Sequence, residues 1–141
     1  MKINKKIAVE ICSVLLAVLF IYTGVSKLID WSETRFSFLN QVFPDSINKL
    51  LLYTIPPVEI LIAIMLLIPR FRQNAFLGSM ILMGAFTLYV GLVLTGVFGR
   101  IPCSCGGIVE SLSWEWHFVV NLLFLFISAV GYFLMRWRRV P

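Results

Sequence analysis

The sequence predicts an all-α membrane protein, a polytopic four-helix bundle with a short interfacial helix in its first outer loop. The chain has 141 residues, of which 60% are apolar and only 13% are charged. Soluble domains contain about 25% charged residues, so this composition indicates little soluble mass. The apolar residues form four long runs. Because these runs are continuous and do not alternate with polar residues, they favour membrane-spanning helices over strands.

The four runs cover residues 7–28, 50–68, 74–98 and 116–135, and we expect them to form one domain over residues 1–141. Each approaches the roughly 20 residues that a helix needs to cross the hydrocarbon core of a bilayer. A basic stretch precedes the first run, as it does in a signal peptide. The run is too long for the apolar region of such a peptide, and no small-x-small cleavage site follows it. We therefore interpret it as a retained first span.

The distribution of basic residues predicts the orientation of the spans. Eight of the 12 basic residues fall on one side of the membrane: Lys2, Lys5, Lys6, Arg70, Arg72, Arg136, Arg138 and Arg139. The other four accompany five acidic residues on the opposite side: Lys27, Arg35, Lys49 and Arg100. The positive-inside rule therefore predicts a bacterial cytoplasmic membrane protein with both termini in the cytoplasm. Since the basic residues flank spans, the net charge of +5 does not indicate nucleic-acid binding.

The first outer loop is expected to contain a short helix over residues 33–42, capped by Ser32. Phe36 and Leu39 share one face of this helix with Phe43, which follows it. A helix with one apolar face lies flat on a membrane surface, so we expect this one to rest on the outer leaflet.

A pair of cysteines separated by one residue is the strongest functional signal in the chain. It occurs in the run Cys103-Ser104-Cys105-Gly106-Gly107, between the last two predicted spans. The predicted orientation exposes this loop to an oxidising compartment, where disulfides persist. The two glycines leave room for the backbone of a partner protein. The motif therefore indicates thiol–disulfide chemistry coupled to the membrane.

Residues around the pair favour a reactive thiolate. Arg100 adds positive charge, and Ser113 can cap the fourth span, whose N-terminal dipole end points toward the loop. A Cys-x-Cys disulfide closes a small, strained ring, and strained disulfides are oxidising. The alternative is a structural disulfide that stabilises the loop and does not exchange with other thiols. The third cysteine, Cys12, lies inside an apolar run and is interpreted as a packing residue.

Glu59 is the most costly residue of the second span. It follows Pro56-Pro57 near the middle of the span, where a carboxylate costs about 2.5–3.5 kcal/mol. The prolines remove backbone donors and free carbonyl groups to face a cavity. One interpretation is a carboxylate that accepts protons or binds a ligand. The other is a structural ion pair with Lys27 of the first span, and the two interpretations do not exclude each other.

Polar residues also mark one face of the fourth span. Trp114, His117 and Asn121 follow the spacing i, i+3, i+7 and therefore share a face. Asn121 would be costly against lipid, so we expect it to point into the bundle. Tyr22 of the first span is expected to add a further polar group to the same interior. His117 is the only histidine of the chain.

Three segments resemble a known family. Residues 100–121, in which Cys-Ser-Cys-Gly-Gly is followed by Trp114 and Asn121, look like the signature of the MauE branch of the MauE/DoxX membrane proteins. Residues 22–27, Tyr-Thr-Gly-Val-Ser-Lys, and residues 57–59, Pro-Val-Glu, are similar to other recurring segments of that family. The resemblance covers nearly the whole chain, and the cysteine motif is its most specific part.

The resemblance implies a four-helix membrane bundle that supports disulfide formation or redox maturation of exported proteins, alongside a thioredoxin-like partner. MauE itself is associated with the maturation of methylamine dehydrogenase. This chain reads Cys-Ser-Cys-Gly-Gly where we expect Cys-Gly-Cys-Phe-Gly in the methylamine branch, so its substrate stays open. The architecture also resembles the quinone-linked disulfide generators DsbB and vitamin K epoxide reductase. Those use more cysteines, and this chain has no second outward pair for an internal relay.

The first hypothesis is therefore a thiol–disulfide oxidoreductase. Cys103 and Cys105 would exchange electrons with an exported thioredoxin-like protein, and His117 or Glu59 would handle the accompanying protons. A quinone or another small apolar carrier would occupy a cavity in the bundle, and this part is inferred from the architecture. The residues expected around that carrier are Lys27, Glu59, Asn121, Tyr22, Trp114 and Arg100.

Two alternatives stay open. Cys103, Cys105 and His117 offer the soft ligands of a Cu(I), Zn or Hg site, which would make the protein a metal-binding or transport protein. The bundle could instead be a non-catalytic subunit that docks to a larger membrane complex. The sequence does not reveal the direction of electron flow, the attacking cysteine, the partner or the oligomeric state.

Overall fold

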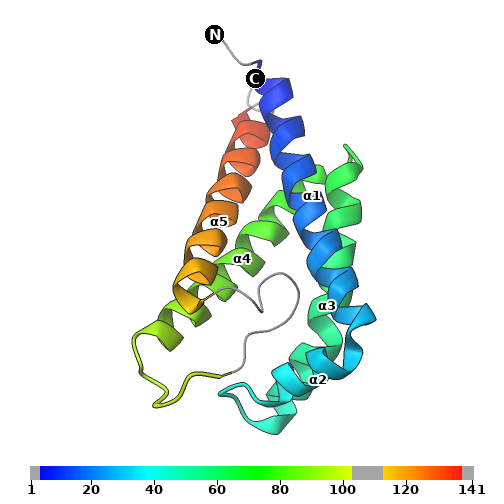
Figure 1. The fold of residues 1–141 in the computed structure, drawn as a ribbon. Helices are drawn as coiled ribbons and strands as arrows, with labels where there is room; N and C mark the ends of the chain where they lie inside the picture. Colours follow the sequence, from blue (N-terminus) through cyan, green and yellow to red (C-terminus); the bar gives the residue numbers. More distant parts are fainter. Residues whose placement is uncertain (1–3, 103–112, 138–141) are drawn as a thin grey trace.

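The computed structural model describes residues 4–102 and 113–137, and these residues form five α-helices without a strand (Figure 1). The helices are α1 (Lys5–Ile29), α2 (Trp31–Leu39), α3 (Asp45–Leu67), α4 (Arg72–Leu94) and α5 (Trp114–Trp137). The predicted all-α class is therefore confirmed.

Four of the helices are long and apolar enough to cross a membrane. They contain 25, 23, 23 and 24 residues, and their most apolar windows have mean hydropathies between 2.0 and 2.3. Large apolar side chains are exposed along all four, including Val18 on α1, Leu61 on α3, Leu88 on α4 and Phe126 on α5. Apolar side chains on the outside of a bundle indicate lipid as the surrounding solvent. The protein is therefore a multi-pass membrane protein.

The helix bounds lie within two residues of the predicted spans except at two places. The second span was expected to begin at residue 50, but α3 already begins at Asp45. The third was expected to continue to residue 98, but α4 ends at Leu94. Gly96 and Gly99 explain the second difference, because they adopt φ angles of 74° and 72°. Only glycine adopts such angles freely, so the chain leaves the helix there.

The short helix α2 lies in the first long connection, as predicted, but it begins two residues and ends three residues earlier than expected. Asp30 occupies the N-cap position that was assigned to Ser32, without a side-chain hydrogen bond. The buried face consists of Thr34, Ser37 and Phe38. Phe36 is 59% exposed, which leaves an apolar side chain available to lipid.

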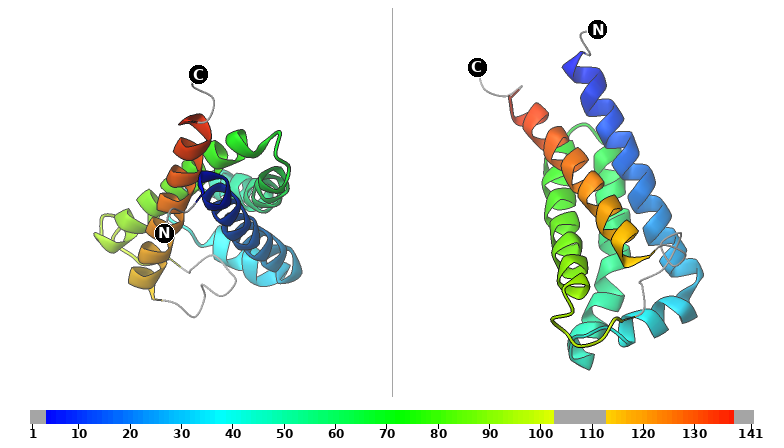
Figure 2. Two further views of the ribbon diagram at one scale, coloured as in Figure 1. Left: turned by 90° about the horizontal axis from the view of Figure 1, so that it is seen from above. Right: turned by 60° about the vertical axis from the view of Figure 1, so that its left-hand side comes forward.

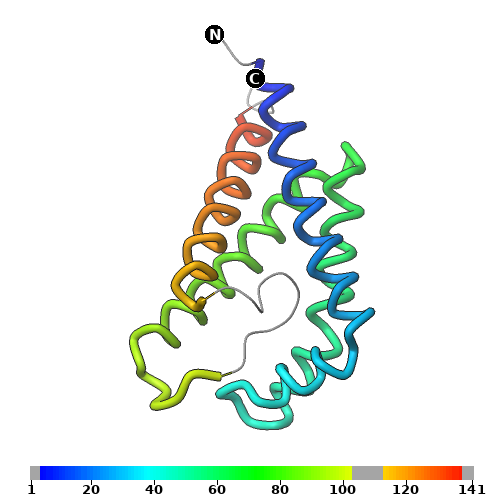
Figure 3. The backbone as a smooth tube through the Cα atoms, in the orientation of Figure 1, coloured from blue at the N-terminus to red at the C-terminus, as the bar shows by residue number. Residues whose placement is uncertain are grey.

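The four spans form two closely packed pairs, α1 with α3 and α4 with α5. The start of α1, the end of α5 and the α3–α4 turn lie together, and we call this the terminal end of the bundle (Figures 1 and 3). Helix α2 and the start of α5 lie at the opposite end, which we call the loop end. The helices approach one another at the terminal end and spread toward the loop end, as Figure 1 and the left view of Figure 2 show.

Hydrogen bonds close the terminal end. The Ser13 hydroxyl donates to the Leu66 carbonyl at 2.6 Å, and Arg72 Nε donates to the same carbonyl at 2.9 Å. Arg72 Nη1 also pairs with Glu10 Oε1 at 2.7 Å. The two hydrogen bonds satisfy the Leu66 carbonyl, near the end of α3, which the helix itself leaves without a donor. The terminal end is therefore held together by contacts between α1, α3 and α4.

Candidate functional site

A cavity of about 270 Å³ lies inside the bundle toward the loop end. One water molecule needs only about 10–15 Å³, so this space is far larger than a packing defect. All five helices contribute to its wall, and most of the lining side chains are apolar. The lining side chains that carry polar atoms are Thr23, Lys27, Gln41, Glu59, Tyr89, Trp114, His117 and Asn121.

Lys27 and Glu59 form a buried ion pair in this wall. Lys27 Nζ lies 2.9 Å from each Glu59 carboxylate oxygen, and the two side chains are 7% and 2% exposed. The ammonium group also lies 3.5 Å from the Thr23 carbonyl of its own helix. Each charge therefore has a partner inside the membrane, which is the condition for burying it there. The structure therefore shows the expected ion pair between Glu59 and Lys27. Because Glu59 also lines the cavity, a role in accepting protons or binding a ligand stays compatible with the pair.

Gly24 allows α1 to approach α3 at the level of the pair. A Cβ atom added to Gly24 would lie 2.8 Å from Ile60 Cγ1 and 3.3 Å from the Pro56 carbonyl oxygen. Such contacts are too short for any larger residue without movement of α3. Small residues at a helix crossing bring two backbones together. Gly24 therefore places Lys27, one turn further along, opposite Glu59.

Ser113 fixes the start of α5. Its hydroxyl accepts a hydrogen bond from the Trp116 backbone N–H at 3.4 Å, and its carbonyl accepts one from the His117 N–H at 3.0 Å. The expected cap is therefore present. It sets the helical register that turns Trp114, His117 and Asn121 toward the cavity, as their spacing predicted. The Trp114 and His117 rings stack with their centroids 5.9 Å apart.

Two polar atoms of this face have no hydrogen-bond partner among the described residues, His117 Nδ1 and Asn121 Nδ2. Asn121 is only 5% exposed. A buried amide without a partner costs about 1–3 kcal/mol, and native proteins keep few of them. An acceptor atom of a ligand in the cavity would remove that cost.

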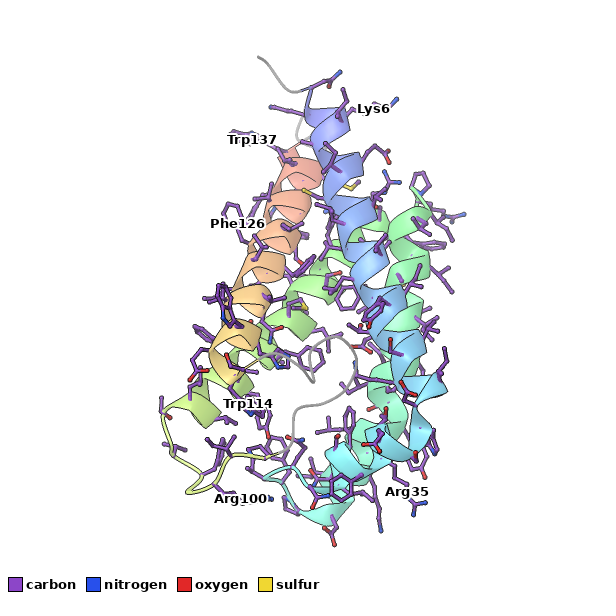
Figure 4. The ribbon with its side chains drawn as sticks, viewed as in Figure 1. Lys6, Arg35, Arg100, Trp114, Phe126 and Trp137 are labelled. Carbon is purple, nitrogen blue, oxygen red and sulfur yellow. The ribbon has the colours of Figure 1, made fainter. Side chains whose placement is uncertain are left out.

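Two predicted site residues lie elsewhere. Tyr22 was expected to face the interior, but it is 40% exposed and lies on a shallow surface hollow with Val18 and Val25. The helical period explains this, because one residue before Thr23 is turned by about 100°. Arg100 does not line the cavity; its guanidinium donates to the Gln41 carbonyl at 2.8 Å. Figure 4 shows Arg100 at the loop end of the bundle.

Sequence reasoning missed a group of polar residues at the loop end. The Tyr89 hydroxyl hydrogen-bonds to Gln41 Oε1, and Gln41 Nε2 donates to the Ser37 carbonyl at 2.8 Å. The fully buried Asn48 donates to the Phe43 carbonyl at 3.0 Å. The Tyr89–Gln41 bond holds the α2–α3 connection against α4, and both residues also face the cavity. No clear signal in the sequence marks this group, because Gln41 and Asn48 lie in a segment with several other polar residues.

Comparison with known proteins assigns the chain to a family. The family described as "Methylamine utilisation protein MauE" matches residues 5–134, which is nearly the whole chain and includes all but the last turn of α5. The chain belongs to the MauE family. The predicted resemblance to the MauE branch is thereby confirmed. The predicted relation to the DoxX proteins stays a prediction. No curated protein and no solved structure matches the chain.

The MauE-like cysteine motif falls in a part of the chain that the structure does not describe. Cys103 and Cys105 belong to residues 103–112, which lie outside the described residues. The described residues on either side are Pro102, which is buried, and Ser113, which caps α5. The soft-metal alternative depends on the same two cysteines. Among residues 4–102 and 113–137, no three His, Cys, Asp or Glu side chains come together as a metal site.

Proposed function

We propose that this MauE-family protein is a membrane thiol–disulfide oxidoreductase. Cys103 and Cys105 exchange electrons with an extracytoplasmic thioredoxin-like protein, and a membrane-soluble carrier of the quinone class takes up the electrons. The observation that carries the proposal is the cavity, where a buried ion pair and an unpartnered amide meet apolar walls beneath the start of α5. The cysteine motif joins α4 to that helix, so it begins and ends at the same end of the bundle.

The electron balance of the exchange is simple. A thiolate of the reduced partner attacks the Cys103–Cys105 disulfide, and the resulting mixed disulfide is resolved by the second thiol of the partner. The partner leaves with a disulfide, and Cys103 and Cys105 are left as two thiols. Their reoxidation releases two electrons and two protons. A quinone bound in the cavity would accept both.

The residues of the cavity fit such a carrier. A quinone offers two carbonyl oxygens on a flat apolar ring, and Asn121 Nδ2 is a buried donor without a partner among the described residues. Trp114 offers an aromatic surface beside it. Lys27 and Glu59 add a charged pair within the same wall, and Glu59 or His117 would hold the proton that accompanies each electron.

The proposed orientation follows from the basic residues. Arg72 and Arg136 lie at the terminal end, where the described lysines 5 and 6 also lie (Figure 4 labels Lys6). Cytoplasmic loops of membrane proteins carry such an excess of basic residues. We therefore place the terminal end in the cytoplasm of a bacterial cell and the loop end outside its cytoplasmic membrane. This orientation brings the cysteine motif to the compartment of exported proteins.

The family description connects its members with methylamine utilisation. The cysteine motif of this chain differs from the one we expect in the methylamine branch. We therefore propose a role in the redox maturation of an exported thiol protein, without restricting that protein to methylamine utilisation.

Replacing one cysteine at a time tests the proposal. We expect Cys103→Ser and Cys105→Ser to abolish disulfide formation in exported substrates of the host, because a single thiol cannot re-form the internal disulfide. Disulfide formation is measured by thiol labelling of the exported proteins after acid quenching. Cys12→Ser is the matched control, because Cys12 packs against the core of the bundle and should leave oxidation unchanged.

Full oxidation in either the Cys103→Ser or the Cys105→Ser strain would overturn the proposal. Metal analysis of anaerobically purified protein adds a second readout. A Cys103–Cys105 disulfide without bound metal supports the exchange of electrons, whereas stoichiometric Cu, Zn or Hg supports the soft-metal site.

A further inference from the structure

The separation between α3 and α4 increases along the wall of the cavity. Near the terminal end the two helices touch: a Cβ atom added to Gly78 of α4 would lie 3.6 Å from Ile62 Cδ1 of α3, in ordinary contact. Toward the loop end α4 leans away from α3, as Figure 1 and the left view of Figure 2 show. Leu51 and Ile55 of α3 line the cavity on this diverging side.

Ala85 marks an opening in that wall. It lies seven residues after Gly78, two helical turns further along, and therefore on the same flank of α4. Ala85 lines the cavity and is itself exposed, whereas every other lining residue is buried or half-buried. A residue that faces the cavity and the outside at once lies at its mouth.

The surface around this mouth is apolar. Ile81 and Leu88, one turn to either side of Ala85 on α4, are both 65% exposed. They belong to a helix of membrane-spanning length and composition. The opening therefore faces lipid tails rather than water.

Polar groups also line the cavity. Asn121 on α5 and the Lys27–Glu59 pair belong to its wall, and Asn121 Nδ2 has no partner among the described residues. A space with a polar interior and an apolar opening to lipid suits an amphiphile. Its head would accept hydrogen bonds inside the bundle, and its hydrocarbon tail would stay in the bilayer.

We propose that the carrier enters and is held through a lateral opening between α3 and α4, where its isoprenoid tail passes Ala85. This inference rests on the proposed function, because it takes the carrier to be a quinone. The ring accepts a hydrogen bond from Asn121, and the first isoprene units of the tail lie between Ile55 and Ala85. The small side chain of Ala85 makes room for them.

Binding of a tailed and a tail-less quinone to purified protein in nanodiscs tests this path. Both probes carry the same benzoquinone ring, and only one carries an isoprenoid tail. In the variant Ala85→Trp we expect the Kd of the tailed quinone to rise about tenfold, the effect of losing contact with about two methylene groups. The Kd of the tail-less ring should change less than twofold. Ala85→Leu should give a smaller effect in the same direction.

Leu123→Trp is the matched control, because Leu123 is exposed on α5, outside the α3–α4 opening, and does not line the cavity. It should leave both Kd values unchanged. Equal weakening of both probes by Ala85→Trp, or no change with either, would overturn the lateral path while leaving the quinone assignment intact. Wild-type protein that binds neither probe would overturn the carrier assignment itself, and the lateral path with it.

Discussion

Lys27 and Glu59 illustrate how a single pair can serve both structure and chemistry. The two charges contact each other at 2.9 Å and are almost fully buried. In a membrane bundle neither can lose its partner without leaving an uncompensated charge in a medium of low dielectric constant. The pair also faces the cavity, where it can act on a ligand. Its two roles can be separated by comparing single and double substitutions.

We expect Glu59→Leu to destabilise the protein by about 3–5 kcal/mol, because it leaves the Lys27 ammonium buried without its partner. The double substitution Lys27→Met with Glu59→Leu should restore stability to near the wild-type value, because an apolar pair of similar volume replaces both charges. Thermal unfolding in detergent measures both effects.

The rate of disulfide formation in exported proteins distinguishes a structural role of the pair from a role in proton transfer. If the pair only holds α1 to α3, the stable double variant should keep full activity. If Glu59 rather than His117 handles the proton, we expect the double variant to remain at least about a hundredfold slower than the wild-type protein, the low end of general acid–base effects. Full activity in that variant would exclude Glu59 as the proton carrier.

The residues of the site differ in how well the sequence predicted them. Lys27, Glu59 and Asn121 are expensive inside a membrane, so their placement toward the bundle interior followed from energetics alone. Tyr22 is amphipathic and tolerates a lipid-facing position, so its placement could not be derived in that way. Gln41 was read as part of a surface helix, and its burial depends on how α2 packs against its neighbours.

Glycines set the distances between the helices. Gly131 of α5 faces the ring of Phe76 of α4, and a Cβ atom added to Gly131 would overlap that ring. The same two helices also meet at Gly84, where an added Cβ would lie 3.9 Å from Leu125 Cδ1. A side chain therefore does not fit at Gly131, whereas a methyl group fits at Gly84.

We expect Gly131→Ala to destabilise the bundle by about 1–3 kcal/mol, because the new methyl group overpacks the α4–α5 contact. Gly84→Ala is the matched control and should be neutral or stabilising, because alanine favours a helix over glycine. Both are measured by thermal unfolding in detergent. Combining Gly131→Ala with Phe76→Leu should recover part of the loss. Equal stability of the two single variants would contradict the packing at Gly131.

The helices themselves were predictable, and their ends less so. Continuous apolar runs determine four spans because a polar backbone must satisfy its own hydrogen bonds in lipid. Where a helix stops depends on local backbone conformation. Gly96 and Gly99 could have indicated the end of α4, but Val97 and Phe98 continued the apolar run and masked the signal. Likewise α3 extends to Asp45 because Asn48 binds the preceding connection.

At the scale of the whole molecule, the two ends of the bundle differ in structure and in proposed role. The terminal end is closed by the Arg72–Glu10 pair and by hydrogen bonds to the Leu66 carbonyl. The loop end holds the cavity and begins the segment with Cys103 and Cys105. Such a division is useful only if the loop end faces the compartment that supplies the thiol partner. Orientation in the membrane is therefore the property on which the proposed exchange depends.

Two introduced cysteines test this orientation in the background Cys12→Ser, Cys103→Ser and Cys105→Ser. Pro69→Cys places a thiol in the exposed α3–α4 turn at the terminal end, and Ile101→Cys places one at the loop end, where Ile101 is 71% exposed. We expect a membrane-impermeant maleimide to label Ile101→Cys in intact cells and to label Pro69→Cys only after permeabilisation, because basic flanks stay in the cytoplasm. Neither substitution removes a basic residue. The reverse labelling pattern would put the cysteine motif in a reducing compartment, where a disulfide would not persist.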